Sequence, residues 1–268
     1  MKIITSILKE HVEYSQQIFK LAKTDLVKTY RGAALGWSWA IIKPAITIFV
    51  YWFAFSVGLR ISEEVSGYPF FLWLLVGIVP WFYMSDMLTQ GINTLKKYSY
   101  LVTKMKYPIS TIPTFVSLSK LSVHLLLMII VILIFLVAGN SPSIYWVQIP
   151  FYILLMFIFF TICALFGSLL SAISKDFYNL VKSFVTPMFW LSGIIWNINT
   201  IEAEWLQKLL MLNPVTFLVE GFRNCFISHT WFFEQPVQLL FFVALTVMML
   251  VLSIWAYKKL RKEIPDVL

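Results

Sequence analysis

Six long apolar segments dominate this sequence and constrain its fold more than any other feature. Each is close to the ~20 residues that a helix needs to cross the hydrocarbon core of a bilayer. They lie at about residues 35–59, 69–91, 109–137, 150–173, 178–198 and 237–257. With 60% hydrophobic and 13% charged residues, the chain has too few polar side chains to cover a water-soluble domain. The sequence therefore predicts an all-α polytopic membrane protein with six transmembrane helices.

Residues 1–33 precede the first apolar segment and follow a different pattern. Apolar side chains such as Ile4, Leu8 and Ile18 recur there at helical spacing, and lysines and glutamates fill many positions between them. An apolar stripe with a basic opposite side is typical of a helix that lies in the membrane interface. Packing on a soluble partner is the alternative, and the two are compatible. We therefore expect an interfacial amphipathic helix at 1–33 and a transmembrane domain at 34–268.

Within the region 199–236, between the fifth and sixth segments, residues 203–227 are apolar enough to suggest a seventh span. Charged residues such as Glu204 and Lys208 interrupt it, and Asn213-Pro214 divides it. Non-spanning elements are tolerated at membrane depth where they bury against protein or line a cavity. Two short re-entrant helices before the last span therefore fit this region better than a seventh span.

The positions of lysine and arginine also favour six spans. Most of the 21 basic residues fall in the N-terminal segment, the loop 93–108, the turn 174–182 and the C-terminal tail, all on one side of a six-span protein. A seventh span would move the basic tail to the other side. Because cytoplasmic loops carry an excess of Lys and Arg, we expect both termini to be cytoplasmic. The formal net charge of +8 then reflects this face of the membrane, and we expect no nucleic acid as a partner.

Sequence motifs for nucleotide binding, metal binding and common hydrolytic chemistry are missing. The sequence has no GxxxxGK[ST] loop, no HExxH, no GxSxG and no Cys/His cluster. Its spans hold one clear acid, Asp86, and one clear histidine, His124, whereas membrane enzymes gather several such groups at one interface. We therefore expect no catalytic residues, no metal site and no cofactor in this chain. A secondary transporter or channel would more often show internal repeats, and none is visible.

Polar and aromatic side chains inside the spans are the first candidates for substrate binding. Lys120 and His124 share one face of the third segment and could line a path for an anionic group. The alternative is that Lys120 reaches the inner interface while His124 bonds a neighbouring helix. Many span aromatics belong to the interfacial belts, but the rest could form rings for sugar-like groups. The residues assigned to this role are Lys120, His124, Tyr51, Phe55, Trp190 and Trp196.

Several local motifs, taken in their order along the chain, resemble the ABC-2-type permeases that export polysaccharides and polyol phosphates. They are Tyr30-Arg31-Gly32 with Leu35-Gly36-Trp37, Gly77–Phe82, Leu101–Pro108, Asn213-Pro214 with Glu220 and Arg223, and the tail Ile264–Leu268. Lys175-Asp176 stands where many members have Arg-Asp, a departure that puts an Arg-specific role in doubt. Trp73–Gly77 and Lys104-Met105 look most like the wall teichoic acid permeases.

The resemblance implies the membrane subunit of an ATP-driven exporter that moves an undecaprenyl-diphosphate-linked polymer across a bacterial cytoplasmic membrane. That polymer would be wall teichoic acid or, alternatively, O-antigen or capsular polysaccharide; a membrane-bound transferase is a remoter alternative. Two copies of the chain would join two ABC ATPase subunits, which would bind the ATP and Mg. Lys28, Arg31 and Lys43 would attract the diphosphate of this lipid-linked polyanion. Asn213, Pro214, Glu220 and Arg223 would form an extracellular structural motif.

The basic loop 93–108 is the expected contact with the ATPase subunit. It joins two spans directly, so a push on it would pass to the transmembrane helices with little slack. Apolar side chains with a charged rim suit a compact protein contact. The alternative is that its lysines only set the orientation in the membrane. The residues assigned to this contact are Lys97, Tyr98, Tyr100, Leu101, Lys104 and Met105.

Overall fold

The computed structural model describes residues 2–59 and 64–268, and in these residues the chain is helical apart from one short hairpin and its connecting turns. Short 3-10 and π helices, marked η, extend or connect the α-helices. The elements are α1 (Lys2–Glu13), α2 (Ser15–Tyr30), η1 (Gly36–Ser38), α3 (Trp39–Trp52), η2 (Phe53–Gly58), β1 (Glu64–Val65), β2 (Tyr68–Pro69), α4 (Phe70–Thr89), η3 (Gly91–Asn93), α5 (Thr94–Lys97), α6 (Ser99–Thr103), η4 (Ile109–Thr111), α7 (Ile112–Val137), η5 (Ile144–Gln148), α8 (Ile149–Ile173), α9 (Lys175–Leu191), η6 (Ile198–Thr200), α10 (Glu204–Met211), α11 (Pro214–Arg223), η7 (Asn224–Ser228), η8 (Phe232–Glu234), α12 (Pro236–Leu260) and α13 (Ile264–Val267).

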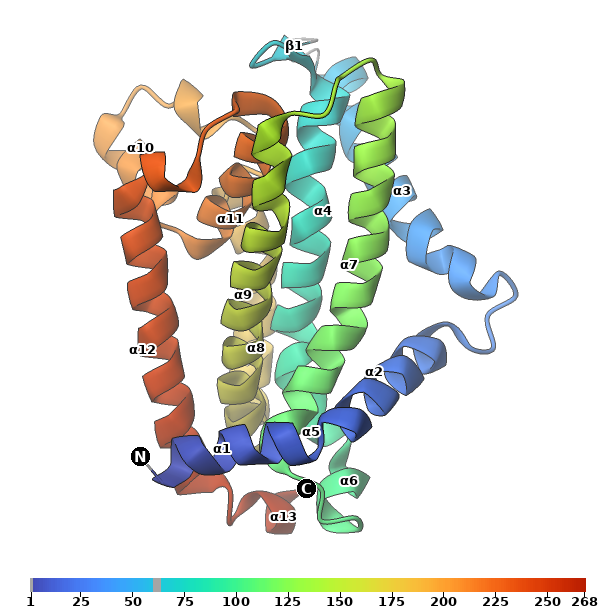
Figure 1. Cartoon of the computed structure of the whole chain (residues 1–268), viewed down its shortest axis with the longest axis vertical. Helices are drawn as coiled ribbons and strands as arrows, with labels where there is room; N and C mark the ends of the chain where they lie inside the picture. The colour runs from blue at the N-terminus through green and yellow to red at the C-terminus, as the bar shows by residue number, and fades with distance from the viewer. Residues whose placement is uncertain (1, 60–63) are drawn as a thin grey trace.

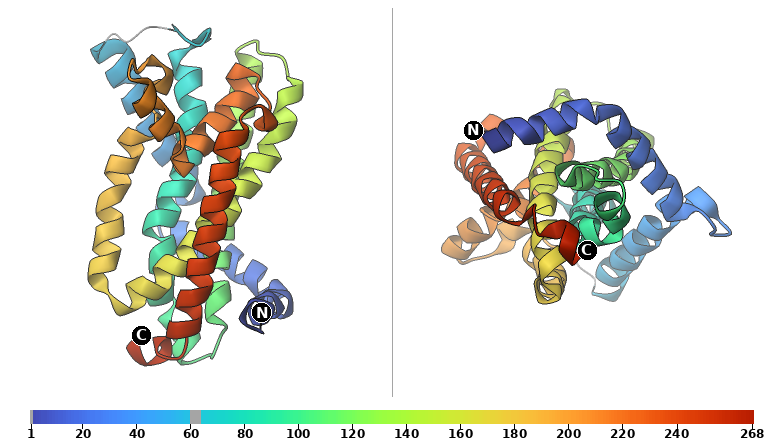
Figure 2. Two further views of the ribbon diagram at one scale, coloured as in Figure 1. Left: turned by 90° about the vertical axis from the view of Figure 1, so that its left-hand side faces the viewer. Right: turned by 90° about the horizontal axis from the view of Figure 1, so that it is seen from below.

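Five continuous helical stretches of the described chain are long and apolar enough to cross a membrane. They are Gly36–Gly58, Phe70–Thr103, Ile109–Val137, Ile144–Ile173 and Pro236–Leu260. The sixth expected span corresponds to α9, which has 17 residues and a charged first turn, and which runs back along the bundle after α8 (Figure 2). The predicted all-α polytopic membrane protein is confirmed.

Both termini lie at the same end of the bundle, together with α1, α5, α6 and α13 (Figure 1). We call this the termini end. The β1–β2 hairpin and α10 lie at the opposite end, which we call the hairpin end. An even number of crossings, as in the six-span arrangement, places the two termini on one side in this way.

Helix α4 occupies the centre of the bundle. Its side chains are buried along most of its length, which explains why it is apolar all round rather than on one stripe. Gly77 lies in close contact with Arg223, where an added Cβ would stand 2.5 Å from Nη2 of that residue. A side chain at this position would therefore collide with the packed interior.

The N-terminal segment differs from the single helix expected at 1–33. It forms two helices, α1 and α2, which change direction at Tyr14 and wrap around the termini end of the bundle (Figure 2). Residues 31–33 form a turn that leads toward α3. The break allows α1 to reach the base of α12 while α2 packs against α7.

One side of α1 is fixed to the bundle by polar contacts. Nε2 of His11 lies 2.9 Å from Oγ1 of Thr114, and Glu10 accepts a hydrogen bond from the Ser110 hydroxyl. Another side of this N-terminal segment exposes large apolar side chains, namely Ile4, Leu8, Val12 and Phe19. The N-terminal segment therefore has two distinct sides, one that contacts the chain's own bundle and one with exposed apolar side chains.

The region 199–236 forms two short helices divided at Leu212–Asn213, as expected. Helix α10 lies on the surface, whereas α11 is buried against α4. The chain then turns at His229, which adopts a left-handed conformation (φ 51°), and begins α12 at the hairpin end (Figure 1). The two helices therefore enter and leave the bundle at the same end without crossing it.

Candidate functional site

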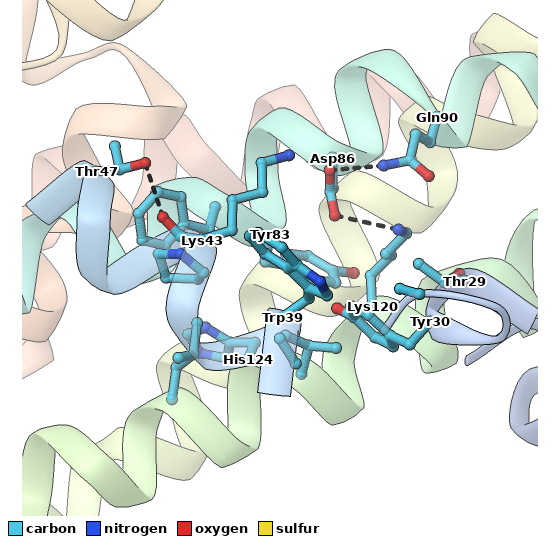
Figure 3. A pocket seen from close by; sticks show the side chains of 16 residues that line it. Thr29, Tyr30, Trp39, Lys43, Thr47, Tyr83, Asp86, Gln90, Lys120 and His124 are labelled. Carbon is cyan, nitrogen blue, oxygen red and sulfur yellow. Dashed lines mark hydrogen bonds and ion pairs between the residues drawn. The ribbon is translucent and has the colours of Figure 1, made fainter. Parts of the chain in front are cut away.

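A cavity of about 390 Å³ lies where α2, α3, α4 and α7 meet. It is the size of a small ligand pocket. Figure 3 shows the side chains that line it. The loop between α2 and α3 contributes to its wall. The residues that line it are Thr29, Tyr30, Ala33, Trp39, Ala40, Lys43, Pro44, Thr47, Phe82, Tyr83, Asp86, Gln90, Lys120, Val123, His124 and Leu127. Three of the residues assigned to substrate from the sequence, Lys43, Lys120 and His124, thus lie around one cavity.

An ion pair supplies the charge inside this cavity. Nζ of Lys120 lies 3.2 Å from Oδ2 of Asp86, and Nε2 of Gln90 donates to Oδ1 of the same carboxylate at 2.8 Å. The Lys120 side chain is 7% exposed and that of Asp86 is 39% exposed. Lys120, for which the sequence left open a path for an anionic group or a position at the inner interface, is therefore already paired with a carboxylate in this conformation.

His124 lies on the same face of α7, one turn further from the termini end. It is buried, it packs against the rings of Tyr83 and Phe222, and its imidazole bonds the backbone of Val79 in α4. This contact agrees with the alternative that His124 bonds a neighbouring helix. Both ring nitrogens are shielded from the cavity space, so His124 contributes to the wall of the cavity.

Aromatic rings form the rest of the cavity wall. Tyr30 and Trp39 come from the region around the α2–α3 loop, and Phe82 and Tyr83 come from α4. The Tyr83 hydroxyl is fixed 2.7 Å from Oγ of Ser117, which anchors the ring on the α7 side. These aromatic residues were missed at the sequence level, where the belts and the site could not be told apart.

The basic residues around the α2–α3 loop separate into two sets. Lys43 lines the cavity and is exposed, and among the described residues it has no carboxylate within ion-pair distance. Lys28 and Arg31 are exposed and lie outside the cavity lining. The structure therefore places Lys43 at the site and the other two on the surface near it.

A second, smaller cavity continues along α3 and α4 toward the hairpin end. It has a volume of about 170 Å³, and Thr47 and Phe82 line both cavities. Tyr51 and Trp190 line it, beside the ring of Phe189. Two of the aromatic residues assigned from the sequence therefore face one hollow between α3, α4 and α9.

The other two assigned aromatics are placed elsewhere. Phe55 is buried and stacks on Phe70, with ring centroids 6.2 Å apart, so it belongs to the core. Trp196 follows α9 and donates its indole N–H to the carbonyl of Trp190 at 2.7 Å. Neither residue lines the two cavities.

The loop 93–108 forms the short helices α5 and α6 at the termini end. Tyr98 and Leu101 are buried, at 4% and 2% exposure, in a cluster with residues of α2 and α7. Their assignment to a partner contact is therefore corrected, because they support the loop from inside. Tyr100, Lys104 and Met105 are exposed, and these side chains remain open to a partner.

Asp25 of α2 joins this loop to the N-terminal segment and was missed in the sequence. It is 2% exposed, accepts a hydrogen bond from Nζ of Lys97 at 2.8 Å, and accepts another from the Tyr98 hydroxyl. Ile18, Ala22 and Asp25 follow one another at i, i+4 and i+7, so Asp25 lies on the apolar stripe of α2. An acidic residue in that position is the sequence feature that could have indicated a buried polar contact.

The electrostatics of Asp25 are set by these partners. Burial raises the pKa of its carboxyl group. Hydrogen bonds from Lys97, Tyr98 and Ser119 and the charge of Lys97 have the larger, opposite effect, so the pKa lies below the ordinary 3.8. Burial and the carboxylate raise the pKa of Tyr98. Near neutral pH the network therefore consists of a carboxylate, an ammonium group and a neutral phenol.

The Asn213, Pro214, Glu220 and Arg223 motif forms a buried clamp at the hairpin end. Arg223 is 1% exposed and donates at 2.7 Å to Glu220 and to the carbonyls of Gly193 and Ile194. Its guanidinium carbon lies 3.4 Å from the ring centre of Trp73. The motif therefore fixes α11 to the segment that follows α9.

Asn213 supplies the second part of this clamp. Its side chain accepts the N–H of Val215 and so caps α11, while Nδ2 donates to Oγ of Ser192 at 3.0 Å. Pro214 fits the first position of the helix, where no backbone donor is needed. In the described residues, no group of three or more His, Cys, Asp or Glu side chains is placed to hold a metal ion.

Comparison with known proteins agrees with this architecture. Residues 16–227 match the family model described as ABC-2 type transporter. The chain is 23% identical over 261 residues to the O-antigen export system permease protein RfbA of Myxococcus xanthus, covering 97% of this chain and 98% of that protein. It is 25% identical over 250 residues to the protein of the same name from Klebsiella pneumoniae, covering 92% and 93%. The inner membrane transport permease YadH of Escherichia coli K12 is 23% identical over 207 residues, covering 72% and 77%. The chain therefore belongs to the ABC-2 type transporter family.

Proposed function

We propose that this chain is the membrane subunit of an ATP-driven exporter that moves a lipid-linked polysaccharide outward across a bacterial cytoplasmic membrane. The observation that carries the proposal is the near-full-length similarity to permeases named for O-antigen export. The substrate would be joined to undecaprenyl diphosphate, with the polymer as its headgroup. A wall teichoic acid is the variant that the sequence motifs favoured, and it rests on those motifs alone.

The proposed orientation puts the termini end in the cytoplasm. Lysines of loop 93–108 and of the C-terminal tail gather at that end, as the positive-inside rule requires. In a cysteine-free background, a cysteine at Glu202 should react with an impermeant thiol reagent added outside intact cells, and a cysteine at Lys259 should not. Labelling of position 259 from outside would contradict the orientation.

A second copy of the chain is expected to complete the pathway. Within α9, all of which is described, only Phe189 is buried, and the polar residues Asn179, Ser183 and Thr186 on one helical face are exposed. A lipid-facing helix would not present such a row. We infer that α3 and α9 of two copies enclose the pathway, which the two cavities would line.

Two ATPase subunits are expected to bind the ATP and Mg and to press on the exposed part of loop 93–108. Tyr100, Lys104 and Met105 form that part. Asp25 ties the loop to α2, and α2 carries Tyr30 into the cavity wall. Movement of the loop would therefore reach the cavity through α2 as well as through α4 and α7.

The test is purification of the chain together with a candidate ABC ATPase from the same genome, followed by measurement of ATP hydrolysis in lipid. We expect a stable complex whose hydrolysis rises when the lipid-linked polysaccharide is added. A chain that forms no complex with any such ATPase, or that transfers sugars without one, would favour the transferase alternative.

A further inference from the structure

We propose that the cavity between α2, α3, α4 and α7 holds an uncharged sugar ring, the first of the substrate's headgroup, while the diphosphate remains at the cavity mouth on Lys43. The inference rests on the proposed function and specifies the chemistry that this one site recognises. It assigns different parts of the substrate to different side chains of the lining.

The distribution of charge separates the two parts. Inside the cavity, Lys120 and Asp86 form an ion pair without net charge, and the carboxylate is the more exposed of the two side chains, so a phosphate or carboxylate group of the ligand meets no unpaired cation there. Lys43 at the mouth is exposed and has no carboxylate partner among the described residues. Of the lysines that line the cavity in the described chain, Lys43 therefore offers a diphosphate a cation that no carboxylate holds.

The polar groups inside suit hydroxyl groups. The two oxygens of a carboxylate offer about four acceptor positions. Gln90 and Lys120 each supply one contact to the Asp86 carboxylate (Figure 3). The Asp86 side chain is nevertheless 39% exposed, and it lines the cavity. The amide group of Gln90 also lines the cavity. Hydroxyl groups of a sugar can donate to the carboxylate and can both donate to and accept from an amide group.

The apolar lining suits the faces of a sugar ring. Tyr30, Trp39, Phe82 and Tyr83 surround the polar groups, and their rings offer apolar contact to C–H faces without requiring one hydrogen-bond pattern. Tyr30 is itself braced by Trp37, with ring centroids 5.5 Å apart. The volume of about 390 Å³ admits a headgroup of one or two rings and no folded polymer.

The experiment compares three lipids that share a polyprenyl diphosphate. One carries no sugar, one carries N-acetylglucosamine and one carries glucuronic acid, which adds a negative charge to a similar ring. Binding to the complex of the full-length chain with its ATPase in nanodiscs is measured by competition in native mass spectrometry. We expect at least tenfold tighter binding of the N-acetylglucosamine lipid than of the bare lipid, and no gain for the glucuronic acid lipid.

Variants then separate the two halves of the site. Trp39→Leu and Gln90→Leu should each reduce the preference for the sugar at least fivefold and leave binding of the bare lipid unchanged. Lys43→Gln should weaken all three lipids by a similar factor. Trp205→Leu is the matched control, because Trp205 is exposed on α10 and lies outside both cavity linings, and it should preserve the preference.

The outcomes distinguish the inference from the proposed function. Equal binding of the bare and sugar-bearing lipids, or tightest binding of the glucuronic acid lipid, overturns the inference and leaves the export function standing. Failure of all three lipids to bind the assembled complex overturns the proposed substrate and the inference with it. Variants are compared only if their complexes match wild type in yield and size, and the two independent cavity variants guard against a folding defect in one.

Discussion

Replacing Asp25 with asparagine should loosen the N-terminal helices from loop 93–108. The substitution keeps the size of the side chain but removes the charge that Lys97 and Tyr98 bond. The carboxylate is almost fully buried, whereas the Lys97 side chain is 35% exposed and can return to water. The loss is therefore smaller than for a fully buried pair, where removal of one partner costs about 3–5 kcal/mol.

The expected magnitude follows from the hydrogen bonds involved. A hydrogen bond to a charged group contributes about 1.5–3 kcal/mol, against about 0.5–1.5 kcal/mol for a neutral one. Weakening two of them in this way predicts a loss of about 2–3 kcal/mol in the local stability of α2. Since 1.4 kcal/mol is a factor of ten, opening of α2 should become about 30- to 100-fold more frequent.

Hydrogen–deuterium exchange of residues 15–30, with the protein in nanodiscs, measures this opening. The matched control is Glu13→Gln, which breaks the exposed Lys9–Glu13 pair on α1, where the side chains are 73% and 53% exposed. Exposed pairs of this kind contribute about 0–1 kcal/mol, so exchange should change little. Wild-type exchange in Asp25→Asn, or the same change in both variants, would refute the reasoning.

The pH dependence gives a second check on Asp25. Because the pKa of its carboxyl group is lower in the folded chain than the ordinary 3.8, its stabilising effect is fully present above that value. The effect is lost as the pH falls through the lower, folded value. The difference in exchange between wild type and Asp25→Asn should therefore be constant between about pH 5 and 8. A difference that disappears within that range would contradict the assignment.

Two further predictions concern packing and the proposed partner contact. Gly77→Ala should cost about 1–3 kcal/mol of stability by overpacking against Arg223, measured as aggregation at a lower temperature. The control Gly58→Ala should not lower this temperature, because its added Cβ meets no atom closer than 4.0 Å. Equal melting of both variants would show that the close approach at Gly77 is absent. Tyr100→Ala should lower recovery of the ATPase and leave the chain itself stable. Leu101→Ala should instead destabilise the chain by about 2–5 kcal/mol, because Leu101 is buried. A stable Leu101 variant that loses only the ATPase would return Leu101 to the contact surface.

The arrangement of spans could be predicted because it depends on local properties of the sequence. Runs of apolar residues set the positions of α3, α4, α7, α8 and α12, and they would do so in any bundle. The two short helices before α12 could be predicted for the same reason, because charged residues and Asn213-Pro214 mark the division locally in the sequence. The exception was the break at Tyr14, which depends on the curvature of the bundle surface that α1 and α2 follow.

The candidate site could be predicted only in part, because it depends on which helices meet. The spacing of Lys120 and His124 placed both on one face of α7, but the partner of Lys120 comes from α4. Asp25 and Lys97 are 72 positions apart, and nothing in either segment alone indicates that they bond. Tyr98 and Leu101 were assigned to a partner because they are apolar, although their burial inside the chain satisfies the same pattern.

Transport by the reconstituted complex tests the central claim most directly. Proteoliposomes would contain this chain, its ATPase and a lipid-linked polysaccharide with a radiolabelled glycan, and a glycan-cleaving enzyme on one side would report which face the glycan occupies. We expect the glycan to move away from the side on which ATP is supplied, only when that ATP can be hydrolysed. Equal movement without ATP, or ATP hydrolysis by the assembled complex with no movement of the glycan, would contradict the account.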